Sequence, residues 1–259
     1  MGPPEKVRIR FRKAGDLRWV SHLDLTRCFE RMLRRAEIPF RSSGGFHPMP
    51  RLVFALSLPL GVVGAEEVVE VELTAPLPPD ELLARLAREA PPGLSFLSAK
   101  RVPAGAAARP RRIVYRLALP PERAPAVRAA CERLLAGAEC WVARARPQPR
   151  RVNVRPFVRG LRADGGALEM DLWVTPAGTA RADELLELLG AADLAEGGTL
   201  ERATLELWDE ISPEQAAEGP ALTGQESVRL ETPAPEPPGR PGHARPARSG
   251  GLPSGPVVE

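Results

Sequence analysis

Near its start the chain reads Val7-Arg8-Ile9-Arg10-Phe11-Arg12, an alternation of apolar and basic side chains. A period of two residues is typical of a strand that buries one face, so the apolar residues are expected in a core and the arginines on the opposite face. A helix is expected directly afterwards. Ser21-His22-Leu23-Asp24 has the form of a capping box, apolar residues follow it at helical spacing, and Pro39 ends the pattern.

Further elements follow this strand and helix in a regular order. We expect strands over 52–58, 69–73 and 94–102, with a short helix over 80–90. The resulting order, β-α-β-β-α-β, is that of the ferredoxin-like unit. The order then recurs with strands over 113–119, 151–161, 167–175 and 200–208, helices over 122–136 and 183–189, and an additional extended segment over 140–146.

The sequence therefore predicts an α+β protein made of two tandem ferredoxin-like units and a disordered C-terminal tail. The first unit covers residues 1–102 and contains the SHLDL helix and the GGFHP loop. A linker over 103–111 leads to the second unit, residues 112–211. From 212 to 259 the composition is dominated by Pro, Gly, Ala, Ser and charged residues without an apolar period, so disorder is expected there.

Opposite charges are expected to face each other across the strands of both units. The first and third strands of a ferredoxin-like unit are antiparallel neighbours, so their outward side chains lie opposite each other. The expected pairs join Arg8, Arg10 and Arg12 to Glu70 and Glu72, and Arg112 and Arg116 to Glu169 and Asp171. Arginines held in such pairs are less available to phosphate groups.

Composition limits the possible classes of protein. The 259 residues are 43% hydrophobic and 27% charged, as in ordinary globular proteins. No apolar run approaches the roughly 20 residues of a membrane-spanning helix, and the start lacks the apolar region of a signal peptide, so we expect a cytoplasmic protein that does not bind a membrane. The chain's three cysteines form no CxxC pair, which argues against a disulfide scaffold, a Cys-based zinc site or a Cys-ligated iron–sulfur cluster.

The net charge of +3 conceals an alternation along the chain. Basic residues exceed acidic ones over 1–60 and 101–160, and acidic residues exceed basic ones over 61–100 and 161–211, which fits the same unit used twice. Among the 36 basic residues, only Lys6, Lys13 and Lys100 are lysines. A GC-rich genome produces such a bias, so the number of arginines alone says little about ligands.

The first predicted helix carries a stripe of guanidinium groups. Arg27, Arg31, Arg34 and Arg35 fall within one sector of the helix, opposite its apolar side. Such a stripe is suited to following a nucleic-acid backbone, with release of counterions. A solvated helix face bordered by Glu30 and Glu37 explains the stripe equally well.

The loop after this helix is the most informative segment. It reads Ser42-Ser43-Gly44-Gly45-Phe46-His47-Pro48-Met49-Pro50-Arg51. Its glycines permit close backbone approach, its hydroxyls and amides suit an anion, and Arg51 adds charge. Phe46 and His47 are flat groups on which an unpaired base could stack. A tight connector would explain the glycines and prolines alone, but the loop is richer than a connector needs, which favours binding.

Two histidines raise the alternative of catalysis. His22 and His47 flank the first helix and would form an acid–base pair for RNA cleavage if they met. The helix separates them by roughly 20 Å unless the loop folds back. A second basic face is expected on the strand over 151–159, where Arg151, Asn153, Arg155, Phe157 and Arg159 alternate with apolar residues and Pro156, although Pro156 equally suggests a protected edge strand.

The sequence resembles the radical-SAM-linked protein family. The likeness rests on Gly15-Asp16-Leu17-Arg18-Trp19-Val20-Ser21-His22-Leu23-Asp24-Leu25, on the basic helix that follows, and on the loop from Ser43 to Arg51. It is dense over about residues 7–75 and looser through the second half. Because the family often has Asn where His47 stands, the resemblance implies no obligatory catalytic role for His47.

This resemblance implies a stand-alone accessory protein, since the chain has no CxxxCxxC motif. No cofactor is then expected in this chain, and a radical-SAM enzyme encoded nearby would be the partner that carries the iron–sulfur cluster and S-adenosylmethionine. We expect the chain to bind ribosomal or transfer RNA and to present it to that enzyme. The expected RNA-binding residues are Arg18, His22, Arg27, Arg31, Arg35, Ser43, Gly44, Gly45, Phe46, His47 and Arg51; no metal ligands are expected.

Two alternatives remain open at this stage. The tandem units and glycine-rich loop also resemble the architecture of the CRISPR-associated RAMP endoribonucleases, in which case His22 and His47 would be catalytic and no metal would be required. Fold alone does not assign this activity. The second alternative is a protein-only adaptor for the radical-SAM enzyme, without affinity for RNA.

Overall fold

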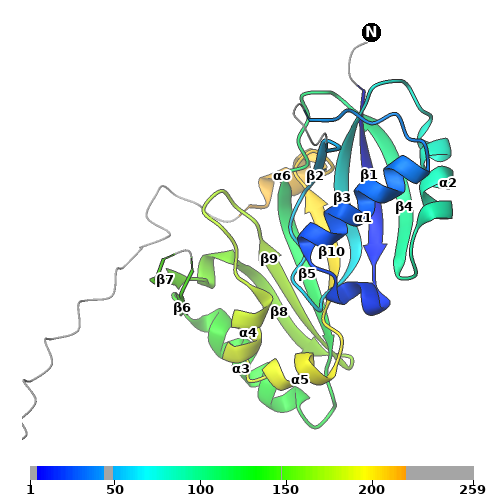
Figure 1. Cartoon of the computed structure of the whole chain (residues 1–259). Coiled ribbons are helices and arrows are strands. Elements are labelled where there is room, and N and C mark those ends of the chain that lie inside the picture. The colour runs from blue at the N-terminus through cyan, green and yellow to red at the C-terminus, as the bar shows by residue number, and fades with distance from the viewer. Residues whose placement is uncertain (1–4, 44–48, 147, 220–259) are drawn as a thin grey trace, which may run out of the picture.

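The computed structural model describes residues 5–43, 49–146 and 148–219. Its strands are β1 (Glu5–Lys13), β2 (Leu52–Phe54), β3 (Val63–Leu73), β4 (Leu94–Val102), β5 (Pro110–Ala118), β6 (Trp141–Arg144), β7 (Arg150–Asn153), β8 (Val158–Asp164), β9 (Ala167–Trp173) and β10 (Glu201–Leu207). Its helices are η1 (Gly15–Trp19), α1 (His22–Arg35), α2 (Pro79–Glu89), α3 (Ala124–Ala136), η2 (Arg155–Phe157), α4 (Ala182–Leu188), α5 (Ala192–Gly197) and α6 (Pro213–Ala217), where η marks a 3-10 helix. The fold is mixed α+β (Figure 1).

One eight-stranded sheet runs through both halves of the chain. Its order is β4-β1-β3-β10-β5-β9-β8, and β2 pairs with β3 beside β10. The first half therefore has the strand order β4-β1-β3-β2, and the second half has the equivalent order β10-β5-β9-β8. The second half also contains the β6–β7 pair and α5.

The two halves meet where β3 pairs in parallel with β10, a junction we call the seam. Only Val63 and Gly64 of β3 take part in this pairing, opposite Glu201 and Arg202. Further along the same edge of β3, the pairing passes to β2. The backbone contact at the seam is therefore short, and side chains must contribute to joining the halves.

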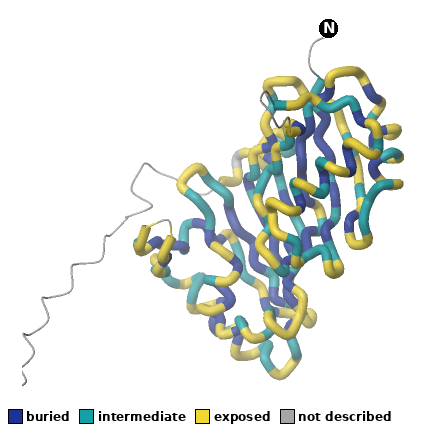
Figure 2. Tube along the Cα trace, viewed as in Figure 1, coloured by how far each residue is buried: buried dark blue, intermediate teal, exposed yellow. Residues whose placement is uncertain are grey.

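Each half has its own apolar core beneath its helices. In the first half the alternation in β1 places Val7, Ile9 and Phe11 against α1 and α2, as expected from the sequence. In the second half, apolar residues of β5 and β9 pack against α3 and α4 in the same way. Figure 2 shows the result, with buried residues concentrated along the strands and exposed residues along the loops and the outer sides of the helices.

The expected charge pairing across strands is confirmed for three arginines. Arg8 donates to Glu70 at 2.8 Å, Arg112 to Asp171 at 2.7 Å and Arg116 to Glu169 at 2.9 Å. Arg10 and Arg12 instead contact Glu210 and Glu201. Glu201 lies in β10 and Glu210 follows it, so these two ion pairs join the two halves rather than strands of one half.

The prediction of one continuous strand over 151–161 is wrong, because two strands and a 3-10 helix occupy this segment. β7 ends at Asn153, and η2 turns the chain before β8 begins. The Asn153 side chain accepts hydrogen bonds from the amides of Cys140 and Arg155, which stabilises this turn. Phe157 is 1% exposed and the Arg155 guanidinium donates to three backbone carbonyls, so the second basic face predicted there does not form.

Other predicted boundaries differ by less. The predicted linker over 103–111 overlaps β5, which begins at Pro110. The tail predicted from 212 onward begins with α6, because Ser212 and Gln215 form a reciprocal capping box and Arg111 donates to two carbonyls of this segment. Residues 220–259 lie outside the described residues. No helix in the described part of the chain is both long and apolar enough to span a membrane.

Candidate nucleic-acid interface

The segment between β1 and α1 is fixed by hydrogen bonds from several directions. The Ala14 amide donates to the Gly93 carbonyl at 2.8 Å, and the Gly61 amide donates to the Arg18 carbonyl at 2.9 Å. The buried Lys13 ammonium donates to the Val20 carbonyl at 2.7 Å. Ser21 then caps α1, since its hydroxyl oxygen accepts from the Asp24 amide at 3.2 Å. This segment holds Arg18 and the start of α1 in one position.

The α1 arginines are exposed, as expected, and most of them have acidic neighbours. Arg27 contacts Asp24 at 3.0 Å, Arg34 pairs with Glu30, and Arg35 contacts Glu89 at 2.7 Å. For Arg31, the described residues supply no carboxylate within ion-pair distance. Exposed pairs of this kind contribute about 0–1 kcal/mol, so a phosphate can replace the carboxylate at small cost.

The described ends of the glycine-rich loop are joined to each other. The Ser43 amide donates to the Met49 carbonyl at 2.8 Å, and the Met49 amide donates to the Ser43 hydroxyl at 3.1 Å. Arg51 and Arg41 both lie 3.5 Å from the Glu72 carboxylate. Of the remaining predicted loop residues, Gly44, Gly45, Phe46 and His47 lie outside the described residues.

The predicted site residues are spread along α1 rather than gathered in one pocket. Arg18 and His22 lie at its N-terminal end, where the ring of His22 contacts Phe54 at a centroid distance of 5.0 Å. The loop ends follow its C-terminal end, where Phe40 bridges to Leu73. A helix of 14 residues is about 21 Å long. The arrangement is an extended surface, which suits a polymer better than a small substrate.

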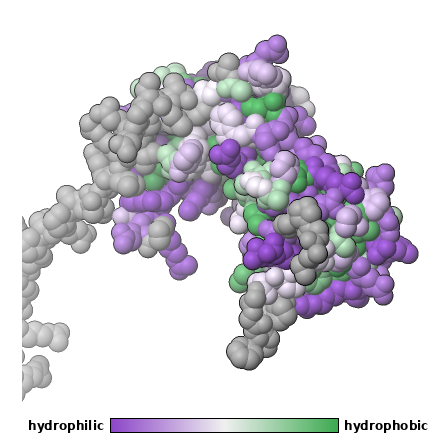
Figure 3. Space-filling view, turned by 90° about the horizontal axis from the view of Figure 1, so that it is seen from above, coloured by the Kyte–Doolittle hydropathy of each residue, from purple (hydrophilic) through white to green (hydrophobic). Residues whose placement is uncertain are grey.

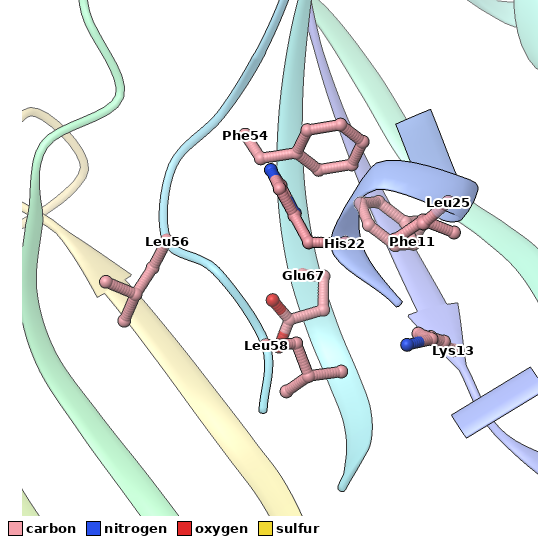
Figure 4. A pocket seen from close by; sticks show the side chains of 8 residues that line it. All are labelled: Phe11, Lys13, His22, Leu25, Phe54, Leu56, Leu58 and Glu67. Carbon is pink, nitrogen blue, oxygen red and sulfur yellow. The ribbon is translucent and has the colours of Figure 1, made fainter. Parts of the chain in front are cut away.

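A small cavity beside His22 has the elements of an acid–base site but not its geometry. It is lined by Phe11, Lys13, His22, Leu25, Phe54, Leu56, Leu58 and Glu67 (Figure 4). Its volume of about 10 Å³ is room for about one water molecule. Lys13 donates to a carbonyl and Glu67 accepts from Arg202, so both are engaged in structural contacts. Burial lowers the pKa of Lys13, an effect that the Glu67 carboxylate partly offsets.

The basic groups on the opposite face of the sheet are neutralised by the chain itself. Arg8, Arg10 and Lys100 all contact Glu210, and Arg8 also contacts Asp209 at 2.8 Å. Burial alone would raise the pKa of Glu210, but hydrogen bonds from Lys100, Arg10 and Arg8 outweigh it and lower the pKa to about 2. These cations are therefore a structural cluster and not a free anion site.

Sequence reasoning missed the groups at the seam. Arg202 of β10 is 1% exposed and donates to Glu67 of β3 at 2.8 Å, and to the carbonyls of Leu56 and Ser57 at 3.2 Å. Burial alone would lower the pKa of Arg202, but Glu67 and Tyr115 raise it above its ordinary value. An adjoining cavity of about 510 Å³ has a mostly apolar lining, and its two arginines both have acidic partners, Arg202 with Glu67 and Arg181 with Glu184 at 3.9 Å. The sequence contains no local pattern that predicts the contact between Arg202 and Glu67, because the parallel pairing of β3 and β10 joins segments that are far apart in the chain.

Trp19 is a second group that sequence reasoning missed as a candidate. Its side chain is 58% exposed, and the Arg18 guanidinium lies 5.1 Å from its ring centroid. The sequence shows a tryptophan next to an arginine, but only the structure shows that the tryptophan ring lies outside the core. Within the described residues, no three His, Cys, Asp or Glu side chains gather closely enough to hold a metal ion.

A family model described as an uncharacterized protein conserved in bacteria (DUF2344) matches residues 6–183. The chain belongs to this family. The DUF2344 match begins in β1 and ends in α4, so it includes η1, α1 and the glycine-rich loop. No curated protein matches the chain. The crystal structure of an unknown protein from Galdieria sulphuraria aligns with 79% of this chain and 99% of that chain, at 11% identity and a TM-score of 0.26.

Proposed function

We propose that this protein is a non-catalytic RNA-binding accessory protein built from two ferredoxin-like units. The observation that carries the proposal is the row of exposed guanidinium groups along α1, which lies between the partly exposed Arg18 and the described ends of the glycine-rich loop. Asp24, the partner of Arg27, is 56% exposed, and Glu89, the partner of Arg35, is 31% exposed, so phosphates can displace these two carboxylates at small cost. Seen from above in Figure 3, the described surface is mainly hydrophilic, with smaller hydrophobic areas between the hydrophilic ones.

The proposed partner is a radical-SAM enzyme that carries an iron–sulfur cluster and S-adenosylmethionine. This part of the proposal rests on the likeness of the η1–α1 segment and the loop to the radical-SAM-linked protein family. The RNA bound here would be ribosomal or transfer RNA presented to that enzyme. Co-purification of the radical-SAM enzyme with the tagged full chain tests the partnership, and failure of the two proteins to associate, with or without RNA, contradicts it.

Replacing three α1 arginines is expected to weaken RNA binding. In Arg27→Ala/Arg31→Ala/Arg35→Ala, the loss of about three phosphate contacts reduces the slope of log affinity against log salt by about 2 for single-stranded RNA. At about 50 mM salt we expect at least a tenfold loss of affinity. Filter binding with labelled RNA measures both quantities.

A charge-matched control comes from the second half. Arg116, Arg162 and Arg181 have side chains that are 61%, 72% and 52% exposed. Replacing these three with alanine removes the same charge from another surface and is expected to change affinity less than threefold. Equal losses in the two triple variants contradict an interface on α1. Cleavage of the labelled RNA by the wild-type protein, abolished in His22→Ala, supports the endoribonuclease alternative instead.

A further inference from the structure

Trp19 has an unusual position for a large aromatic side chain, because it is exposed and yet immobilised. Its ring packs on Gly61, where a Cβ atom would lie 2.7 Å from the ring atom Cζ3. Gly61 also has φ of +80°, a left-handed conformation that favours glycine. Trp19 is nevertheless 58% exposed, with the Arg18 guanidinium over its ring.

The backbone around Trp19 is fixed as well. The carbonyl before it, of Arg18, accepts from the Gly61 amide at 2.9 Å, and the carbonyl after it, of Val20, accepts from the Lys13 ammonium at 2.7 Å. Lys13 is 1% exposed, so this second bond is protected from water. Little conformational entropy is therefore lost when a ligand contacts the ring.

The surroundings of the ring are basic and partly apolar. Arg18 lies 5.1 Å from the ring centroid, and the described residues place no carboxylate within ion-pair distance of its guanidinium. Leu60, next to Gly61 in the chain, is 62% exposed. Two acidic residues are also near in the sequence. Asp16 is exposed in η1, and the Asp24 carboxylate accepts hydrogen bonds from Ser21 and Arg27.

A flat exposed ring beside a cation that has no carboxylate partner among the described residues is suited to a nucleobase and its phosphate. Unpaired bases stack on aromatic side chains, whereas bases within a duplex have both faces covered by their neighbours. Trp19 ends η1, immediately before the arginine-bearing helix α1. An RNA strand whose phosphates contact the α1 arginines would therefore reach the Trp19 ring at the N-terminal end of the helix.

We propose that Trp19 is the stacking platform for one unpaired base of a single-stranded RNA, with Arg18 contacting the adjacent phosphate. This inference rests on the proposed RNA-binding function and names the form of RNA that the surface takes. Docking of an acidic protein partner on Trp19 is an alternative outcome of the test.

The test compares two ligands and three proteins by fluorescence anisotropy, using the full chain. The ligands are labelled oligouridine of about 12 nucleotides and an abasic strand with the same phosphates. Trp19→Leu is expected to bind oligouridine about tenfold more weakly than wild type, and Trp19→Phe to stay within about threefold. On the abasic strand, all three proteins are expected to bind alike, because no base is present to stack.

Controls separate stacking from loss of structure and from loss of apolar surface. Leu97→Ala removes a 49% exposed apolar side chain on β4 and is expected to bind oligouridine like wild type. The thermal unfolding midpoints of the Trp19 variants, measured in parallel, are expected to match wild type because most of the ring is solvated. Intrinsic fluorescence is expected to be quenched by oligouridine in wild type and less so in Trp19→Phe.

The outcomes divide between the inference and the function on which it rests. If Trp19→Leu binds oligouridine like wild type, or weakens equally on the abasic strand, the stacking role is wrong while RNA binding stands. If wild type binds neither strand at low salt, the proposed function and this inference both fail. If Trp19→Leu leaves RNA binding intact but abolishes association with the radical-SAM enzyme, the surface docks a protein and the stacking role is overturned.

Discussion

A Glu67→Ala variant is expected to lose about 3–5 kcal/mol of unfolding free energy, the largest effect of any single substitution proposed here. The Arg202 guanidinium is 1% exposed and faces Glu67 across the seam. Without the carboxylate, a buried cation has no counter-charge, and its desolvation is no longer compensated. Urea denaturation at neutral pH measures the loss.

An exposed pair with the same chemistry provides the control. Glu169→Ala removes the partner of Arg116, and the Arg116 side chain is 61% exposed. This substitution is expected to lower the unfolding free energy by less than about 1 kcal/mol. Removing both buried charges in Glu67→Leu/Arg202→Met is expected to recover much of the stability lost in the single variant. If Glu67→Ala is no more destabilising than Glu169→Ala, the buried pair does not hold the seam together.

The second large effect is a pH dependence centred on Glu210. Its pKa in the folded protein is about 2, below the ordinary value of 4.5. A carboxyl group with a lowered folded pKa stabilises the fold above its unfolded pKa, and this contribution is lost as the pH falls from about 4.5 towards 2. At about 1.4 kcal/mol per unit, the contribution at neutral pH is about 3 kcal/mol.

Glu210→Gln therefore lowers the unfolding free energy at pH 7 and reduces its decline between about pH 5 and 2. Glu66→Gln is the matched control, because Glu66 is 51% exposed and lies 3.8 Å from Arg10, one of the cations that contact Glu210. Denaturant unfolding at a series of pH values gives both curves. If the difference in unfolding free energy between wild type and Glu210→Gln does not change with pH, then Arg8, Arg10 and Lys100 do not lower the pKa of Glu210 in the folded protein.

Both effects concern contacts that the sequence could not reveal. The alternation in β1 and the Ser21 cap depend on neighbouring residues, and both were predictable. The position of Arg8 opposite Glu70 was predictable as well, because the order of elements fixes which strands are neighbours. Arg202 and Glu67 are 135 residues apart, and no local pattern brings them together.

The errors in the second half have a similar origin. The alternation in 151–159 has the period of a strand, but Asn153 uses its side-chain oxygen to form a turn and Phe157 is buried. Local periodicity does not show when a side chain competes with backbone pairing. In the candidate interface, the exposure of the α1 arginines was predictable from helical spacing, whereas the exposure of Trp19 depends on its contact with Gly61 in a distant loop.

RNA binding by the α1 surface is the central claim, and its salt dependence is the most direct test. The full-length protein is titrated with a single-stranded RNA at about 50 and 200 mM salt. The three contacts assigned to Arg27, Arg31 and Arg35 alone predict an affinity about 20-fold weaker at the higher concentration, and a contact from Arg18 makes the dependence steeper. Absence of binding at the lower concentration, or an affinity that does not change with salt, contradicts the account.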